Sequence, residues 1–149
     1  MPPAALADAV AEQCARVPGA AWLKPHGALY HAADDDPAIA AAVLAGATRV
    51  LARFTAIGPS GGAFAAACRD RGIRIAVEGF ADRAAREVGG RLVLVPRGEP
   101  GAVIVDPDAA AANARRLAGR VDTICVHGDT PGAVAIARAV RGALDALAG

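Results

Sequence analysis

Hydrophobic and polar positions alternate along the chain in blocks that predict helices and short apolar strands in turn. A helix is predicted over residues 3–17, where Leu6, Val10, Cys14 and Val17 recur every three or four positions. Apolar segments predict four short strands, over residues 20–24, 50–57, 73–77 and 121–126. Further helices are predicted from Pro37, over 63–71, over 107–117 and from Thr130.

Local signals mark the ends of several of these elements. Asp34–Asp36 precede Pro37, which is typical of a carboxylate cap followed by proline at the first helical position. Gly72 and Gly119 are expected to end two helices. The last helix is expected to bury a stripe of Ile136, Val140, Leu144 and Leu147. Residues 79–101, rich in Gly, Arg and Pro, are predicted to be irregular.

The alternation of helix and strand predicts an α/β fold, with a parallel sheet, right-handed crossovers and helices on the faces of the sheet. The 149 residues fit one domain, but they are short for a complete (β/α)₈ barrel of about 250 residues. Hydrophobic residues make up 54% of the chain and aromatic residues only 3%, so the core is expected to consist of Ala, Val, Leu and Ile.

Composition argues against several classes of partner. A formal charge of +1 and a single Trp and Tyr argue against a nucleic-acid surface, which needs a basic face. No apolar run approaches the length of a membrane span, and the N-terminus lacks the pattern of a signal peptide. Three widely spaced cysteines suggest no disulfide framework, so a cytoplasmic location is expected.

Ionisable side chains follow three of the four predicted strands, while the strands themselves are apolar. They are Lys24 and His26 after the first, Glu78, Asp82 and Arg83 after the third, and His127 and Asp129 after the fourth. Because ligands of parallel α/β folds bind beyond the carboxyl ends of the strands, we expect these side chains to meet at one cleft. Both histidines are followed by glycine, which lets a ligand approach the backbone closely.

These residues also have ordinary structural interpretations. His127 could be a hydrogen-bonded residue at a strand end, and Lys24 a solvated one. Asp129 could cap the last helix, a role that is compatible with substrate contact. The charged residues after the third strand could form a structural ion pair beneath a loop. Their convergence on one edge of the sheet is what favours a functional site.

Other segments carry weaker signals. Residues 58–62 precede a helix N-terminus but lack the Gly-Lys-Ser/Thr ending of a phosphate-binding loop, so we predict mainly a turn, with carboxylate or phosphate contact as the alternative. Asp34–Asp36 are predicted to be a solvated cap rather than a metal site, and His31 to lie in a loop. Cys125 is predicted to be a buried, inert thiol. A nucleophilic role for it would need His127 on the same side, which their spacing allows.

Three longer motifs closely resemble the LamB/YcsF family. They are Lys-Pro-His-Gly-Ala-Leu-Tyr (24–30), Glu-Gly-Phe-Ala-Asp-Arg (78–83) and Thr-Ile-Cys-Val-His-Gly-Asp-Thr-Pro-Gly-Ala-Val (123–134). Between the second and third motifs, Arg97 and residues 100–104 are also similar to the family pattern. The motifs occur in the family's order and span almost the whole chain, which is far more specific than any single short motif.

The resemblance implies a partial (β/α) barrel of the glycoside hydrolase/deacetylase type, with residues 1–149 as a single domain corresponding to its C-terminal part. The family provides one of the three components of bacterial 5-oxoprolinase. This implies a part in the ATP-dependent hydrolysis of 5-oxo-L-proline (pyroglutamate) to L-glutamate, acting with B and C subunits, with ATP used by the assembled complex. The implied site residues are Lys24, His26, His127 and Asp129 for catalysis, and Glu78, Asp82, Arg83 and Arg97 for substrate binding.

The sequence also departs from the family pattern. It lacks the family's Asp-Leu-Asn-x-Asp-x-Gly-Glu, His-Ala-Gly-Asp and Ala-His-Pro motifs, so we expect an N-terminally truncated relative. Ala84 and Ala85 stand where a tyrosine is usual, and His31 replaces an asparagine. The alternative function is therefore a non-catalytic remnant that binds a small carboxylate ligand or partner subunits without turnover.

Opening a lactam requires activation of the carbonyl oxygen by ATP, a general base for water and positive groups for the oxyanion. The base is expected to be His26 or His127. The cations expected to hold the substrate carboxylate or the oxyanion are Lys24, Arg83 and Arg97. The acid that orients a histidine is expected to be Glu78 or Asp129.

Two expectations concern metals and assembly. The sequence shows no evident set of three metal ligands, so we expect no tightly bound metal. An opened barrel leaves two unpaired strand edges, which proteins usually cover, so we expect a homodimer or a larger homo-oligomer.

Overall fold

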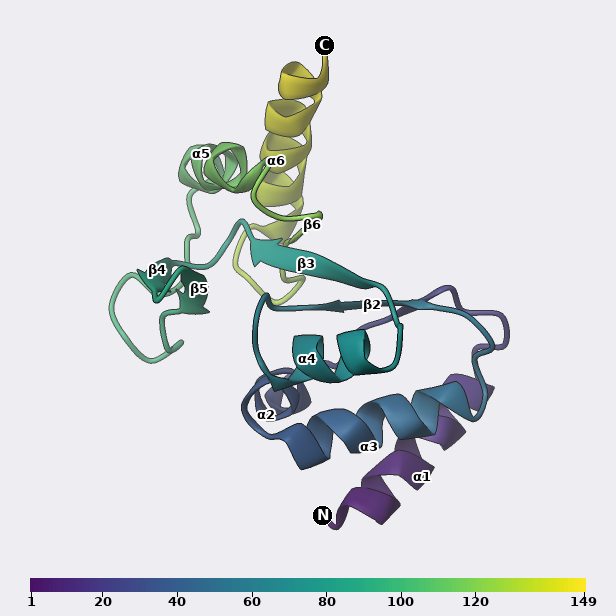
Figure 1. The fold of residues 1–149 in the computed structure, drawn as a ribbon. Helices are drawn as coiled ribbons and strands as arrows, with labels where there is room; N and C mark the ends of the chain where they lie inside the picture. Colours follow the sequence, from purple (N-terminus) through teal and green to yellow (C-terminus); the bar gives the residue numbers. More distant parts are fainter. The chain divides into compact units, whose positions relative to one another are not determined.

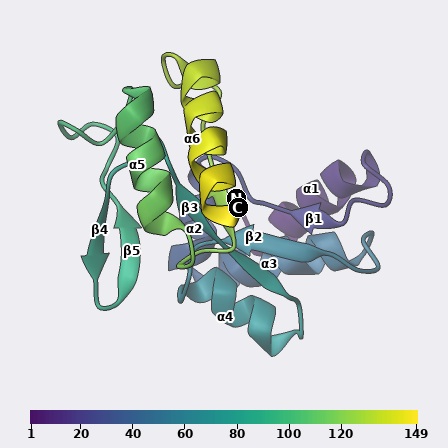
Figure 2. The same cartoon turned by 90° about the horizontal axis from the view of Figure 1, so that it is seen from above.

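The computed structural model describes residues 1–149, apart from the side chains of Arg91 and Ala148. The chain divides into two compact units, the N-terminal unit (Met1–Val77) and the C-terminal unit (Glu78–Gly149). Strand β3 (Ile75–Phe80) contains the boundary, so three of its residues belong to each unit. Figures 1 and 2 label the elements along the chain, with β1 labelled in Figure 2.

The N-terminal unit alternates helices with parallel strands. It contains α1 (Pro3–Ala15), β1 (Trp22–Leu23), α2 (Ala28–Asp35), α3 (Pro37–Thr48), β2 (Thr55–Gly58), α4 (Ala63–Asp70) and the first half of β3. Strand β1 pairs with β2, and β2 pairs with β3, both in parallel. The segments between the paired strands run through α2 and α3 and then through α4, as parallel pairing requires.

Small side chains let the helices of the N-terminal unit pack closely around its core. Leu44, Phe64 and Cys68 are among the fully buried residues of this core. Helix α1 packs on α3 at Gly46, where an added methyl group would overlap the carbonyl oxygen of Ala7. The scarcity of aromatic residues is therefore compensated by close contact between backbones rather than by large side chains.

The C-terminal unit begins in β3 and ends in a long helix. It contains the hairpin of β4 (Ala85–Val88) and β5 (Arg91–Leu94), then α5 (Pro107–Leu117), β6 (Thr123–Cys125) and α6 (Ala133–Ala148). Strand β6 pairs with β3 in parallel, with Phe80 opposite Cys125. Helices α5 and α6 lie side by side in both ribbon views (Figures 1 and 2), and their core consists of Ala81, Ala110, Ala114, Ile136 and Val140.

The pairings give the strand order β1-β2-β3-β6, and each of them is parallel. Helices precede or separate these strands in the chain. The expected fold class, an α/β fold with a parallel sheet and alternating helices, is confirmed by this pairing.

Two predicted helix starts and two predicted helix ends are confirmed. Asp36 caps α3, because its Oδ1 accepts hydrogen bonds from the backbone N–H of Ala38 at 2.7 Å and of Ile39 at 3.4 Å. Helix α5 begins at Pro107, as expected. Gly72 and Gly119 follow α4 and α5 with φ of 65° and 77°, a conformation that side chains disfavour.

Three segments differ from the expected elements. Residues 28–35 form helix α2, so His31 lies in a helix and not in a loop. Strand β3 begins and ends later than expected, which places Glu78 inside the strand instead of after it. Residues 79–101 are not irregular throughout, because they contain the β4–β5 hairpin.

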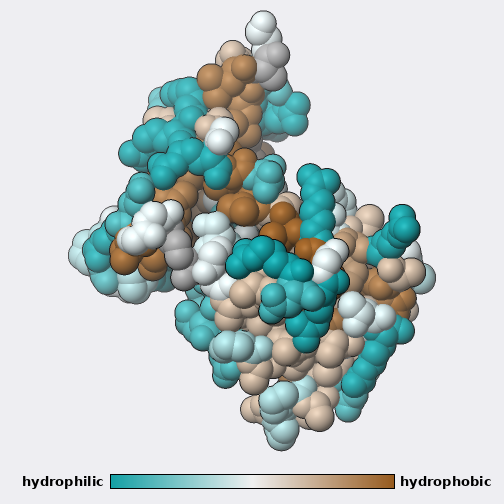
Figure 3. All heavy atoms as spheres, viewed as in Figure 1, coloured by the Kyte–Doolittle hydropathy of each residue, from teal (hydrophilic) through white to brown (hydrophobic). Residues whose placement is uncertain are grey.

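Several apolar residues of the predicted helices and strands are exposed. Val17 lies beyond the end of α1, and Leu147 lies in the last turn of α6; they are 59% and 56% exposed. Trp22, expected in a buried strand, is 57% exposed. Figure 3 shows hydrophobic side chains at the surface along α6. None of the helices in the described part of the chain is both long and apolar enough to cross a membrane.

Candidate functional site

A buried carboxylate lies just beyond the carboxyl end of β3. The side chain of Asp82 is fully buried, and hydrogen bonds reach it from the segment that follows β6. Its Oδ2 accepts from the backbone N–H of His127 at 3.0 Å and from Thr130 Oγ1 at 2.6 Å. Its Oδ1 lies 3.0 Å from His127 Nδ1. Asp82 therefore joins the ends of the two strands through its side chain.

These contacts decide the charge of Asp82. Burial opposes its ionisation and is the largest single influence on its pKa. The hydrogen bonds from Thr130 and His127 together outweigh burial, so the pKa of Asp82 lies below its ordinary value. An ionised carboxylate accepts hydrogen bonds only, so the Nδ1 atom of His127 is the donor.

The His127 ring is fixed on two sides and partly open to solvent. It stacks on the Phe80 ring with 5.2 Å between centroids and 12° between planes. Its side chain is 26% exposed, whereas that of Asp82 is fully buried. With the proton on Nδ1, the Nε2 atom carries the lone pair of the imidazole and can accept a proton. This Asp82–His127 pair, hereafter the dyad, has the arrangement of an oriented general base.

Helix α5 holds the backbone that carries Asp82. The Nδ2 amide of Asn113 donates to the carbonyl oxygens of Phe80, Ala81 and Arg83, at 3.0, 3.0 and 3.2 Å. Arg116 Nη2 donates to the Oδ1 atom of the same amide at 3.1 Å. Asn113 was not among the residues expected from the sequence; its only signal there is a polar side chain in an alanine-rich helix.

Arg83 is a buried clamp on the hairpin and its following loop. Its Nη2 donates to the carbonyl oxygen of Val95 at 2.7 Å, and its Nε to that of Ala102 at 3.2 Å. Burial lowers the pKa of Arg83, as does the charge of Arg97, while the charge of Asp82 raises it. Its hydrogen bonds go to backbone carbonyls, which fits the structural interpretation better than a contact with substrate.

Arg97 and Asp129 form an ion pair at the surface of the C-terminal unit. Arg97 Nη1 lies 3.0 Å from Asp129 Oδ2, and Nη2 lies 3.5 Å from Oδ1. The hydrogen bonds from Arg97 lower the pKa of Asp129, and the same contact raises that of Arg97. The expectation that Asp129 caps the last helix is wrong, because α6 begins at Ala133 and the residue before it, Gly132, offers no side chain. Thr130, also expected at the helix start, instead binds Asp82.

The remaining predicted site residues are Lys24, His26 and Glu78. Lys24 Nζ lies 5.8 Å from the centre of the Tyr30 ring within the N-terminal unit. His26 is exposed and precedes Gly27, whose φ of 58° lets the chain turn into α2. Glu78 pairs with Thr123 across the β3–β6 ladder, and its Oε2 atom is buried. That Lys24 and His26 share a cleft with His127 stays a prediction.

The side chain of Asp34, a residue of α2, lies against the loop at residues 58–62. A methyl group added to Gly62, the residue before α4, would overlap Asp34 Oδ1. Asp34 therefore lies against the N-terminus of α4 and is not the solvated residue expected from the sequence. A phosphate at this position would meet the negative charge of Asp34, so the loop does not fit a nucleotide phosphate.

The cysteines are candidate nucleophiles, and the cysteine, histidine and acidic side chains are candidate metal ligands. Cys14, Cys68 and Cys125 are free thiols, and burial raises the pKa of Cys68 to about 11. Cys125 is partly buried in β6, and its role as an inert thiol or a nucleophile stays a prediction. Among the side chains that the structure describes, no group of three or more His, Cys, Asp and Glu is suited to hold a metal ion.

Comparison with known proteins finds relatives that are similar to this chain in sequence. The chain is 40% identical to the 5-oxoprolinase A subunit of Streptomyces avermitilis, over 98% of the chain and 66% of that protein. It is 43% identical to the 5-oxoprolinase A subunit of Mycobacterium avium, over 84% of the chain and 54% of that protein. The chain thus spans less than two thirds of the length of these curated relatives.

A solved structure supports the same assignment. The lactam utilization protein of Thermus thermophilus matches 99% of the chain with a TM-score of 0.83 and 28% identity, and 66% of that protein is covered. This likeness confirms the expected fold class. The model of the LamB/YcsF family matches residues 4–148. This chain therefore belongs to the LamB/YcsF family.

Proposed function

We propose that this chain is a component of an ATP-dependent 5-oxoprolinase, which hydrolyses 5-oxo-L-proline to L-glutamate together with partner subunits. The observation that carries this proposal is the dyad, in which buried Asp82 orients the partly exposed ring of His127. The names of the relatives support the substrate class, since two are A subunits of 5-oxoprolinase and one is a lactam utilization protein.

In the proposed mechanism His127 is the general base. ATP, used by the assembled complex, would activate the lactam carbonyl oxygen by transferring its terminal phosphoryl group to that oxygen, with release of ADP. His127 Nε2 takes a proton from the attacking water while the water oxygen bonds to the carbonyl carbon. Asp82 keeps the ring in the Nδ1–H tautomer and stabilises the imidazolium that forms. The imidazolium then returns its proton to the lactam nitrogen as the carbon–nitrogen bond breaks, which frees the amine. Hydrolysis of the resulting acyl phosphate would release inorganic phosphate and leave glutamate.

Arg97 is the proposed contact for the carboxylate of the substrate. Its guanidinium is half exposed, and it already binds a carboxylate end-on through both Nη atoms. Lys24 is a proposed cation for the developing oxyanion, His26 a second acid or base, and Glu78 a further substrate contact. Asp129 already binds Arg97, so it would compete with the substrate carboxylate for the guanidinium.

ATP and the partners are assigned by chemistry. Asp34 lies against the glycine-rich turn at residues 58–62, where its carboxylate would repel a phosphate. We therefore propose that ATP binds to the B or C subunit rather than to this turn. Strands β1 and β6 are the outer strands of the order, so we propose that a second copy or another component of the complex covers one of them. Light scattering at micromolar concentration tests the homo-oligomer, and a monomer contradicts it. The proposed location is the cytoplasm, where free thiols persist.

The experiment combines the chain with 5-oxoprolinase B and C subunits and measures phosphate and glutamate release that depend on 5-oxoproline. The longer relative from Streptomyces avermitilis is the positive control. His127→Ala is expected to abolish glutamate release, whereas His31→Ala, a matched change at an exposed position of α2, is expected to retain it. No turnover from the chain with B and C subunits that work with the longer relative would overturn the proposal. Ligand or partner binding without turnover would then support the non-catalytic alternative.

A further inference from the structure

Arg97 and Asp129 meet in the geometry that a guanidinium uses for any carboxylate. Each Nη atom of Arg97 faces one oxygen of Asp129, at 3.0 Å and 3.5 Å. Such a fork-to-fork contact has the same shape whether the carboxylate belongs to a side chain or to a ligand. Asp129 therefore occupies the position in which a small carboxylate would bind Arg97.

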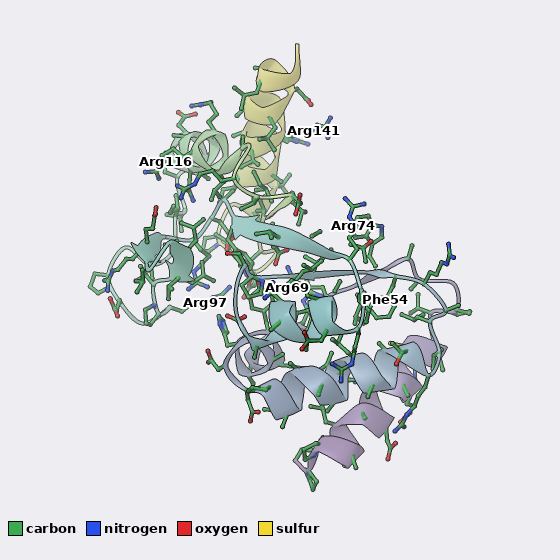
Figure 4. The ribbon with its side chains drawn as sticks, viewed as in Figure 1. Phe54, Arg69, Arg74, Arg97, Arg116 and Arg141 are labelled. Atoms are coloured by element: carbon green, nitrogen blue, oxygen red, sulfur yellow. The ribbon has the colours of Figure 1, made fainter. Side chains whose placement is uncertain are left out.

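The backbone beneath Arg97 is fixed. Arg83 donates to the carbonyl oxygens of Val95 and Ala102, which lie on either side of the loop that carries Arg97. Within the loop, the N–H of Glu99 donates to Pro96 and that of Ala102 donates to Glu99. Figure 4 shows Arg97 next to the β4–β5 hairpin. The guanidinium is thus presented from an anchored loop, as an orienting contact requires.

The ion pair and the dyad are joined by one short turn of the chain. Asp129 follows His127 by two residues, in a turn where the N–H of Thr130 donates to the carbonyl oxygen of His127 at 3.3 Å. The charge of Asp82 raises the pKa of Arg97, so the carboxylate of the dyad acts electrostatically on the ion pair. A carboxylate that replaces Asp129 on Arg97 therefore binds next to the turn that also carries His127.

We propose that Asp129 is a placeholder that holds Arg97 before the ligand binds and is displaced by the carboxylate of the ligand. The proposal rests on the proposed function, because it takes Arg97 as the residue that binds the substrate carboxylate. The ligand class is a small molecule that carries a carboxylate next to a ring amide. An uncharged lactam has no group that can displace Asp129.

Exposure makes the exchange possible. The side chains of Arg97 and Asp129 are 49% and 68% exposed. Exposed ion pairs are weak, because solvent screens them and both side chains lose freedom when they pair. The internal carboxylate competes with the ligand, so it lowers the apparent affinity by the fraction of time that the pair is closed. Asp129 in this way lowers the affinity of ligands that bind Arg97 through a carboxylate and leaves the affinity of uncharged ligands unchanged.

Calorimetry on the full 149-residue chain tests the proposal, with 5-oxoproline as the probe and uncharged 2-pyrrolidinone as the control probe. Asp129→Asn removes the competing charge at nearly constant size. It is expected to tighten 5-oxoproline binding about two- to fivefold and to leave 2-pyrrolidinone unchanged. Arg97→Ala is expected to weaken 5-oxoproline binding about tenfold or more, in the native chain and in the Asp129→Asn background.

Asp145→Asn is the matched control, because Asp145 is also an exposed aspartate paired with an arginine, on α6. It is expected to change neither probe's affinity. Circular dichroism verifies the fold of each variant. The proposal is overturned if Asp129→Asn weakens binding of 5-oxoproline or leaves it unchanged, if the gain survives Arg97→Ala, or if the Asp129→Asn chain does not bind 5-oxoproline.

Failure of this proposal differs from failure of the proposed function. Tighter binding by Asp129→Asn without any turnover beside B and C subunits supports the placeholder and contradicts catalysis. Turnover that depends on His127, with no effect of Asp129→Asn on 5-oxoproline affinity, supports catalysis and contradicts the placeholder.

Discussion

Asp82 and His127 are 45 positions apart in the chain, yet Asp82 Oδ1 lies 3.0 Å from His127 Nδ1. Parallel pairing explains this, because β3 and β6 run side by side and both residues follow the carboxyl ends of these strands. The acid and the histidine expected at these strand ends therefore meet in the C-terminal unit, but the acid that orients the histidine is Asp82. The sequence had indicated Glu78 or Asp129 for that role.

Asp82→Asn is predicted to lower turnover by at least about a hundredfold with a smaller change in KM, because an amide that donates to Nδ1 imposes the wrong tautomer on His127. The measurement is glutamate release in the mixture with B and C subunits. Asp35→Asn, an exposed residue of α2, is the matched control and is expected to retain turnover. Equal turnover in the Asp82→Asn and unmodified chains would show that the dyad is not the base.

Thr130→Val is predicted to lower the free energy of unfolding at neutral pH by about 1–3 kcal/mol, because it removes the 2.6 Å hydrogen bond to buried Asp82. Valine keeps the shape of threonine, so packing changes little. The loss of this bond also raises the pKa of Asp82 towards its ordinary value. Urea unfolding of both chains measures the difference.

The difference in unfolding free energy between the native and Thr130→Val chains is expected to depend on pH. In the native chain the pKa of Asp82 is lower than its ordinary value of 3.8, so its ionised form stabilises the fold. That contribution is fully present above pH 3.8 and is lost as the pH falls through the pKa of the folded state. The stability gap between the native and Thr130→Val chains is therefore expected to narrow below this pH. A gap that stays constant on acidification would contradict the assignment.

Elements with local signals could be predicted from the sequence. The start of α3 followed from Asp36 and Pro37, since cap and first turn lie within a few residues of each other. The β4–β5 hairpin also had a local signal, although residues 79–101 were expected to be irregular. Gly89 and Gly90 have φ of 58° and 78°, the conformation of a tight hairpin turn, and a Gly-Gly pair between two four-residue strands is typical of it.

Contacts between distant residues could not be predicted in this way. Thr130 precedes a proline, so its local pattern favours a helix start, but its hydroxyl binds Asp82 across the fold instead. Asn113 looks like any polar residue on a helix, and its role depends on carbonyl groups 30–33 positions away. Both roles require the tertiary structure, because no periodicity along the chain encodes which donor reaches which acceptor.

Asn113→Ala is predicted to lower the free energy of unfolding by about 1–3 kcal/mol, because three carbonyl groups at the end of β3 lose their shared donor. Arg116→Ala is the comparison, since it removes only an exposed contact to the other side of the same amide and is expected to cost about 0.5 kcal/mol or less. Urea unfolding measures both changes. Equal losses would mean that the hydrogen bonds from Asn113 to the end of β3 contribute little to stability.

Gly46→Ala is predicted to destabilise the N-terminal unit by about 1–3 kcal/mol, because the new methyl group would overlap the carbonyl oxygen of Ala7 and lie 2.9 Å from Val10 Cβ. Helix α1 would have to move away from α3, which opens the core of that unit. Gly142→Ala is the matched control, since Gly142 also lies inside a helix but has no neighbour within 4 Å. That change is expected to raise the free energy of unfolding by about 0.5–1 kcal/mol through helix propensity. Opposite signs in urea unfolding are therefore expected, and a stabilising Gly46→Ala would contradict the close packing of α1 on α3.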